Sequence, residues 1–303
     1  MPSLEDVKLF IERRLAFVER AKDRRFLKHL HAMNENGGAP VVRAGGPVVS
    51  LTSYGKRVET VYLTIESIAA GSLLPSEIVL WLDDEKRFNS LPTSLQKLKK
   101  RGLTINLTNN YGPHTKYYPF VDSREEFPTP LVTADDDIIY PTYWLQYLVD
   151  AYARNPQVVN CHRARVIALD GDELAPYLQW DLCESTEPAW HHFLNGVSGV
   201  IYPPKLLAAL KDAGTAFVDC CPKADDVWLH AIALRQGYRV IQIGKRAMHF
   251  PVVPGSEEIA LFPTNMASGN DSQIKKTYTR EDIRRIAEGA KNLAGQPSDV
   301  VQL

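Results

Sequence analysis

Short apolar runs that alternate with helical stretches constrain the fold of this chain more than any other feature. We expect strands at 47–53, 77–82, 103–108 and 130–137, with helices at 58–70 and 92–100. Strands that alternate with helices form a parallel sheet that is covered by helices on both faces. The sequence therefore predicts an α/β fold with a mostly parallel central sheet.

The rest of the chain continues this alternation and adds a helical segment at each end. We expect helices at 142–154, 203–213, 224–236 and 280–293, a strand-rich stretch at 158–169 and a strand at 238–244. Apolar residues at helical spacing predict an amphipathic helix in residues 4–33, and the turn-forming run NENGGAP follows it. The predicted parts are an N-terminal helical extension (1–40), a central domain (41–250, with halves 47–140 and 141–250) and a C-terminal loop and helix (251–303).

The charge balance limits the partners that this chain can attract over a broad surface. Its 303 residues are 45% hydrophobic, and 35 Lys and Arg oppose 36 Asp and Glu, which gives a formal charge of −1. Such a composition is that of an ordinary globular protein and excludes disorder, collagen and coiled coil. Nucleic acid is not an expected partner, because it would need a large basic surface. Any bound anion must therefore be held by local groups.

The cysteines and the first residues of the chain bear on the compartment. The four cysteines (161, 183, 220 and 221) lack the paired spacing of a zinc site, and we expect reduced thiols in a cytoplasmic protein. The first 30 residues carry charges throughout, so we expect neither a signal peptide nor a membrane-spanning helix there. The basic residues of helix 4–33 leave a peripheral contact with the inner membrane open as an alternative to simple docking on the domain.

Polar residues follow three of the four predicted strands of the first half. In open α/β sheets, ligands bind outside the carboxyl ends of the strands. The polar residues at these ends are Thr52, Tyr54 and Arg57 after the first strand, Asp83 and Asp84 after the second, and Asp135, Asp136 and Asp137 after the fourth. We expect these positions to converge although they are far apart in sequence.

The acidic triplet follows a buried apolar run, where carboxylates are costly unless a cation neutralises them. Strand alternation places Asp135 and Asp137 on one side and Asp136 on the other. Two oxygen ligands on one side suit a hard divalent ion such as Mg²⁺ or Mn²⁺. The alternative is a solvated turn ahead of Pro141.

Further polar residues occur at loops and helix starts downstream and upstream of the triplet. Lys116 in the run GPHTK could reach a phosphate, although a lone loop lysine is more often a surface residue. Gly196 and Gly199 allow close approach of the backbone to a ligand, or else form a turn. Asp225 and Asp226 begin a helix, where capping accounts for one carboxylate and leaves the second free.

For three other features, the sequence allows either a functional or a structural role. His249 follows a strand and could be a third metal ligand or a structural histidine. Trp180, Trp190, His191 and His192 could offer aromatic faces to a sugar or pack in the interior. The run 262–278 could be a mobile loop that closes over a diphosphate, or a solvated surface loop.

The order of these motifs resembles that of the GT-A-fold glycosyltransferases, over residues 47–250. The triplet matches the family's DxD motif, Asn195 to Gly199 its glycine loop, the pair Asp225 and Asp226 its xED motif, and His249 its C-terminal histidine. The runs VVSLTSYGKRVETVYLTIESI and GPHTK are similar to bacterial transferases of capsule and lipopolysaccharide assembly, with the plan of glycosyltransferase family 2. Asp225 stands where many relatives have Glu, which is a mild departure.

The resemblance implies a Rossmann-like GT-A catalytic domain, with a nucleotide-binding half at 47–140 and an acceptor half at 141–250. It implies that Asp135, Asp137 and His249 hold a divalent ion (Mn²⁺ or Mg²⁺) and that Asp226 is the base of an inverting transfer. The residues implied to bind the nucleotide-sugar are Thr52, Tyr54, Arg57, Asp83, Asp84, Lys116 and Asp136. Those implied to bind the acceptor are Trp190, Gly196, Gly199 and Asp225.

The implied function is a hexosyltransferase of class EC 2.4 that moves a sugar from a nucleotide-sugar, UDP-hexose or UDP-N-acetylhexosamine, to a hydroxyl of a bacterial surface glycan, free or lipid-linked. One alternative is a Mg²⁺-dependent nucleotidyltransferase. Against it, the chain has no obvious glycine-rich basic run for a triphosphate after the first strand, and SYGKR is the best match. Another is a carbohydrate-binding homologue without turnover. The retained acidic triplet, acidic pair and histidine argue against the latter.

Overall fold

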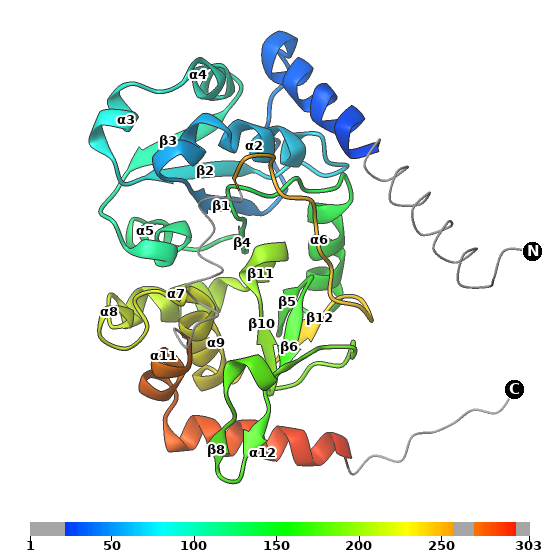
Figure 1. Cartoon of the computed structure of the whole chain (residues 1–303), viewed down its shortest axis with the longest axis vertical. Coiled ribbons are helices and arrows are strands. Elements are labelled where there is room, and N and C mark those ends of the chain that lie inside the picture. The colour runs from blue at the N-terminus through cyan, green and yellow to red at the C-terminus, as the bar shows by residue number, and fades with distance from the viewer. Residues whose placement is uncertain (1–21, 257–269, 295–303) are drawn as a thin grey trace, which may run out of the picture.

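A seven-stranded sheet forms the centre of the computed structural model, which describes residues 22–256 and 270–294 (Figure 1). The strand order is β12-β5-β11-β4-β1-β2-β3. The strands are β1 (Val48–Thr52), β2 (Glu77–Leu82), β3 (Leu103–Leu107), β4 (Leu131–Thr133), β5 (Val159–Cys161), β11 (Val200–Tyr202) and β12 (Val240–Gln242). Only β11 runs antiparallel to its neighbours in this sheet. The predicted α/β class, a Rossmann-like and mostly parallel sheet flanked by helices, is confirmed.

Helices cover both faces of the sheet and were largely predicted from the apolar periodicity. They are α2 (Val61–Ala69), α3 (Glu85–Asn89), α4 (Thr93–Lys100), α5 (Tyr118–Asp122), α6 (Trp144–Arg154), α7 (Pro204–Ala213), α8 (Phe217–Cys220), α9 (Asp225–Arg235), α11 (Asn270–Thr277) and α12 (Arg280–Ala294). Short 3-10 turns are η1 (Gly55–Glu59), η2 (Gly112–Lys116), η3 (Tyr177–Gln179) and η4 (Gly196–Ser198). The sequence did not predict α3, α5, α8 or α11, because such short helices carry little periodicity.

The two faces of the sheet lie in separate hydrophobic clusters, as alternating side chains require. Val49 and Leu51 of β1 pack with α2, α4 and α6, whereas Val48 lies in the cluster that contains α5, α7 and α9. Leu51 pairs with Leu80 and both are fully buried. Burial on both faces explains why the central strands read as continuous apolar runs.

The sheet ends earlier at β4 than the sequence predicted. The expected strand 130–137 stops at Thr133, and the acidic triplet lies in the turn that follows. The Thr64 hydroxyl donates to the backbone carbonyl of Asp136 (2.9 Å), which takes this peptide out of the strand pairing. The triplet is therefore in loop geometry just beyond the carboxyl end of β4.

A small second sheet follows the first half. Its strands are β6 (Ala164–Val166), β9 (Asp181–Leu182) and β10 (His192–Leu194), in the order β10-β6-β9, and β7 (Leu169–Asp170) pairs with β8 (Glu173–Leu174). The stretch between 170 and 195, for which the sequence predicted no helix or strand, thus contains strands. In Figure 1 this sheet lies beside α9 and α12 in the lower half of the molecule.

The ends of the chain are described in part. Residues 22–36 are helical, which confirms that part of helix 4–33, and residues 1–21 lie outside the described residues. Leu30 packs with Leu63, Ile139 and Val253. The run 262–278 is corrected in part: Asn270–Thr277 forms α11, whose Ile274 is buried, while 262–269 lie outside the description. The division into domains stays a prediction.

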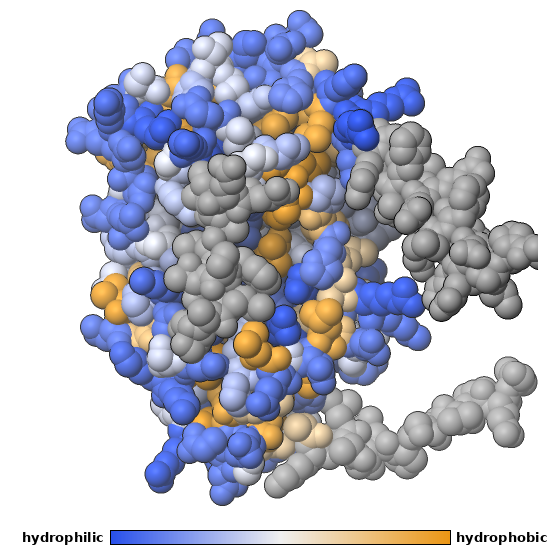
Figure 2. All heavy atoms as spheres, viewed as in Figure 1, coloured by the Kyte–Doolittle hydropathy of each residue, from blue (hydrophilic) through white to orange (hydrophobic). Residues whose placement is uncertain are grey.

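Polar side chains cover most of the face drawn in Figure 2, and apolar ones show between them. No helix in the described ranges combines the length and the apolar character needed to cross a bilayer.

A buried carboxylate, Glu66, links the N-terminal helix to the central domain through an ion pair and a hydrogen bond. Glu66 on α2 is fully buried and accepts hydrogen bonds from Arg101 and from Asn34 of the N-terminal helix. We expect Arg101→Ala to lower the free energy of unfolding by about 3–5 kcal/mol, because it leaves a buried carboxylate without its cation. Urea denaturation measures this loss. Lys100→Ala, at the exposed neighbouring position, serves as the control, and an equal loss in both variants would contradict the account.

Candidate functional site

The predicted polar positions meet at the carboxyl ends of β1 and β4 and at the start of α9. Lys116 ends η2, and its backbone carbonyl accepts a hydrogen bond from Ser50 of β1 (2.7 Å). Asp135 follows β4, and Asp225 begins α9. Residues from three separate parts of the sequence therefore share one site at the edge where α/β proteins bind ligands.

Lys116 lies at the centre of this site and is not a surface lysine. Its Nζ is 2.8 Å from Oδ1 of Asp135 and 3.1 Å from Oδ2 of Asp225, and the residue is 9% exposed. Burial alone would lower the pKa of Lys116, but the carboxylates of Asp135, Asp225 and Asp226 raise it well above its ordinary value. The ammonium is therefore a fixed positive charge among carboxylates.

The turn before η2 is held by an aromatic contact that the sequence did not predict. The His114 ring stacks on Phe217 with centroids 3.9 Å apart, and its Nε2 lies 2.7 Å from the carbonyl oxygen of Cys221. Burial lowers the pKa of His114 to about 4, so the ring is neutral at pH 7. These contacts join η2, which carries Lys116, to the segment that leads into α9. The sequence signal that could have indicated this contact is His114 itself, two positions before Lys116.

Asp136 and Arg57 hold the triplet in place. Arg57 Nη1 is 2.9 Å from Asp136 Oδ1, and Arg57 Nη2 is 2.9 Å from Asp137 Oδ2. The Ser53 hydroxyl donates to Asp136 Oδ2 at 2.6 Å, and Asp136 is only 5% exposed. Asp136 and Asp137 thus share Arg57, while Asp135 pairs with Lys116. The grouping expected from strand alternation, Asp135 with Asp137 and Asp136 opposite, is not the grouping of these ion pairs, because the triplet lies in the turn after β4. Asp136 and Arg57 bind each other, and the nucleotide-sugar contacts expected of them stay a prediction.

Asp135 and Asp137 keep the more accessible carboxylates of the triplet, with side chains 26% and 16% exposed. The pKa of Asp137 is raised to about 6. Burial and then the charge of Asp135 raise it, and Arg57 opposes the rise. Carboxylate oxygens are the donors that Mg²⁺ and Mn²⁺ prefer, and each of these two carboxylates has a cationic side chain as its partner here, Lys116 for Asp135 and Arg57 for Asp137. The metal role of Asp135 and Asp137 stays a prediction.

His249 does not complete this donor set in the described residues. No three of their His, Cys, Asp and Glu side chains are grouped as metal ligands. Both ring nitrogens of His249 instead lie within hydrogen-bond distance of Arg163 Nη1, at 2.8 and 3.0 Å. Burial, and then the charge of Arg163, lower the pKa of His249. The predicted trio is thus not assembled here, and the metal role of His249 stays a prediction.

Asp226 is held by the glycine loop rather than by a cation. The Gly196 N–H lies 3.0 and 3.1 Å from its two carboxylate oxygens. A Cβ on Gly196 would lie 2.8 Å from Oδ1, so a larger residue there would displace the Asp226 carboxylate from this position. The pKa of Asp226 is raised to about 7. Burial and then the charge of Asp225 raise it, while Lys116 and the Gly196 N–H oppose the rise. A partly buried carboxyl with such a pKa can exchange a proton near neutral pH.

The polar residues after β1 and β2 differ in their local roles. The Thr52 hydroxyl donates to the carbonyl of Trp81 (3.1 Å), and the Tyr54 ring lies 5.7 Å from the Arg57 guanidinium. Asp84 caps α3 by accepting from the Arg87 N–H (3.1 Å). Of the two carboxylates expected to bind the nucleotide-sugar, Asp83 is therefore better suited than Asp84, which already caps α3.

Three residues expected near an acceptor have structural contacts. Trp190 packs against the hydrophobic core, and a Cβ on Gly289 of α12 would lie 3.4 Å from it. Trp180 is 1% exposed, which excludes it as a sugar platform in this geometry. Gly199 has a φ of +98°, and a Cβ there would lie 2.5 Å from Nε1 of Trp144, so it serves close packing.

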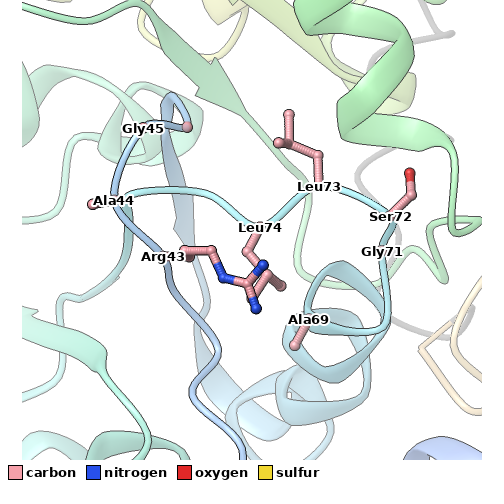
Figure 3. Close-up of a pocket in the computed structure, with 9 residues that line it drawn as sticks. Arg43, Ala44, Gly45, Ala69, Gly71, Ser72, Leu73 and Leu74 are labelled. Atoms are coloured by element: carbon pink, nitrogen blue, oxygen red, sulfur yellow. The ribbon is translucent and has the colours of Figure 1, made fainter.

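A separate cavity of about 420 Å³ lies at the opposite ends of the strands (Figure 3). It is lined by residues 43–46, just before β1, and by residues 69 and 71–74, before β2. Arg43 is its charged side chain. Because the acidic triplet and Asp226 lie at the carboxyl ends, this cavity is no part of the candidate site.

Comparisons with known proteins give distant structural neighbours only. No family model matches the sequence, and no curated protein matches it. S. aureus TarS 1–349 is similar in structure at 14% identity and a TM-score of 0.45, covering 84% of this chain and 75% of that one. A CMP:2-keto-3-deoxy-manno-octonic acid synthetase complexed with CTP has 12% identity and a TM-score of 0.41, covering 73% and 98%. A 4-diphosphocytidyl-2C-methyl-D-erythritol synthase from Anaerococcus prevotii has 12% identity and a TM-score of 0.43, covering 73% and 96%. These likenesses carry no information on the reaction of this chain.

Proposed function

We propose that this chain is a metal-dependent, inverting glycosyltransferase (class EC 2.4) that uses a nucleotide-sugar and a hydroxyl acceptor. The observation that carries the proposal is Asp226: a partly buried carboxyl with a pKa of about 7, beside Lys116 and the acidic triplet. An inverting transfer needs one base beside the reacting sugar and positive charge at the leaving group. The proposed donor is UDP-hexose or UDP-N-acetylhexosamine, and the proposed acceptor is a bacterial surface glycan.

The donor half is proposed to be built on the triplet and on η2. Asp135 and Asp137 would hold Mn²⁺ or Mg²⁺, which would neutralise the charge of the departing nucleoside diphosphate. Lys116 supplies a fixed positive charge next to Asp135. Asp136 and Arg57 would position the triplet through their ion pair. Thr52, Tyr54 and Asp83 would line the nucleoside position at the ends of β1 and β2.

The acceptor half is proposed to centre on Asp226. The carboxylate would take the proton of the attacking hydroxyl, while the Gly196 N–H keeps its two oxygens in position. Asp225 would remain paired with Lys116 and would raise the pKa of Asp226 by its charge. The same proposal divides the domain at residue 140 into a nucleotide half and an acceptor half. It also places the protein in the cytoplasm, with peripheral contact at the inner membrane through helix 4–33.

Direct donor binding tests the proposal. We expect a panel of UDP-, GDP- and CMP-sugars, titrated calorimetrically with Mn²⁺ and with a chelator, to contain a ligand that needs the ion. Asp137→Asn should weaken that binding about 10-fold or more, because one oxygen ligand of the ion loses its charge. Asp212→Asn, at an exposed position on α7, is the control. The absence of binding by every nucleotide-sugar in both conditions would contradict the proposal.

A further inference from the structure

Two neighbouring arginines, Arg163 and Arg165, have no carboxylate salt-bridge partner in the part of the chain that the structure describes, and Arg163 interacts electrostatically with Asp226. Arg163 and Arg165 flank Ala164 at the start of β6, so strand alternation places their side chains on one side. Arg163 Nη1 contacts the neutral ring of His249, and Arg165 donates to the carbonyl of Trp180 and lies 5.1 Å from the centroid of the Tyr177 ring. None of these contacts neutralises the two positive charges.

The backbone connects this arginine pair directly to the proposed base. The Asn195 N–H donates to the carbonyl of Arg163 (3.0 Å), and the next residue, Gly196, donates to Asp226. Burial, and then the charge of Arg165, lower the pKa of Arg163, while Asp226 acts in the opposite direction. Arg163 therefore lies within electrostatic range of both Arg165 and Asp226.

Three buried polar atoms at this place lack hydrogen-bond partners. Asn195 is 6% exposed, and its Oδ1 accepts no hydrogen bond, while its Nδ2 donates to the Tyr177 hydroxyl (3.3 Å). The Nε atoms of Arg163 and Arg165 are also buried and without a partner. Leaving such groups unpaired is costly, so each is suited to a ligand atom. Asn195 Oδ1 would accept from a hydroxyl, and the guanidinium groups would donate to an oxyanion.

We propose that Arg163 and Arg165 bind an anionic group of the acceptor, so that the acceptor is a sugar that carries a phosphate or a carboxylate. This rests on the proposed function, in which Asp226 faces the acceptor. An anionic acceptor would otherwise be repelled by Asp225, Asp226 and the triplet, and the two arginines offset that repulsion. Asn195 would accept a hydrogen bond from a hydroxyl of the same sugar.

Binding of matched small probes tests this assignment without a donor. Titration with glucose, glucose 6-phosphate and glucuronate should give tighter binding of one of the two anionic sugars than of glucose, and the preferred anion identifies the group. Arg163→Gln and Arg165→Gln should each reduce that preference about 10-fold or more, because each removes charged hydrogen bonds. Arg239→Gln, at an exposed position before β12, should retain it.

Two results would overturn the assignment. One is equal binding of glucose and both anionic sugars by the unmodified protein. The other is loss of nucleotide-sugar affinity in Arg163→Gln or Arg165→Gln with the preference for anionic sugars unchanged, which would place the pair at the donor. Selective binding of an anionic sugar by a protein that binds no nucleotide-sugar would keep this anion site and reject the glycosyltransferase proposal.

Discussion

Asp226→Asn is expected to reduce sugar transfer by about 10²-fold or more while nucleotide-sugar binding stays near that of the unmodified protein. The amide keeps the shape of the side chain and an oxygen that accepts from the Gly196 N–H, but it cannot take a proton. In the unmodified protein, the rate should rise with pH and level off above about pH 7, because the base acts only when it is ionised. Initial rates across pH measure both effects.

The same substitution should stabilise the fold, with a defined pH dependence. Burial and Asp225 raise the pKa of Asp226 in the folded protein to about 7 from the ordinary value of 3.8, so ionisation of this carboxyl costs folding free energy. The gain in stability from Asp226→Asn should therefore grow from about pH 4 to about pH 7 and then stay constant. Asp219→Asn, at an exposed position on α8, is the control. Loss of nucleotide-sugar binding in Asp226→Asn would instead assign Asp226 to the donor site.

Lys116→Met is expected to affect activity and stability together. The change removes the cation that lies 2.8 Å from Asp135 and 3.1 Å from Asp225, and it leaves carboxylates without a partner in a buried site. The cost in free energy of unfolding should be about 3–5 kcal/mol at pH 8. Because Lys116 lowers the pKa of Asp226, its loss should also shift the rise of the pH–rate profile to higher pH.

Two further variants separate the charge of Lys116 from its shape. Lys116→Arg keeps a cation and should retain the pH–rate profile in part. Lys223→Met, at an exposed position two residues before α9, should change neither stability nor the profile. An unchanged pH–rate profile in Lys116→Met would contradict the electrostatic coupling between this lysine and Asp226.

Local patterns predicted the positions of the sheet and of the acidic groups. The apolar runs at β1 and β2 are buried on both faces, so their composition identified them. The rule that ligands bind at the carboxyl ends of strands placed the residues after β1 near the acidic triplet, and Arg57 does pair with Asp136 and Asp137. These features depend on neighbours in sequence or on a general property of parallel sheets.

Contacts between distant segments could not be predicted in the same way. Arg57 pairs with Asp136 across 79 positions, and nothing in either run indicates the other. Trp190 is partly buried and packs near Gly289 of α12, a neighbour 99 positions away that its own run does not indicate. His249 follows a strand as predicted, but its neighbour is Arg163, whose position at β6 depends on the pairing of the small sheet.

The identity of the released phosphate compound tests the central claim most directly. The protein is incubated with the nucleotide-sugar that it binds, and separately with a nucleoside triphosphate and a sugar 1-phosphate, and the products are followed by phosphorus NMR. The account predicts hydrolysis of the nucleotide-sugar, in which water takes the place of the acceptor hydroxyl and the products are nucleoside diphosphate and free sugar. This release should be lost in Asp226→Asn and retained in Asp219→Asn. Pyrophosphate from the triphosphate reaction, with the nucleotide-sugar left intact, would contradict it and would identify a nucleotidyltransferase.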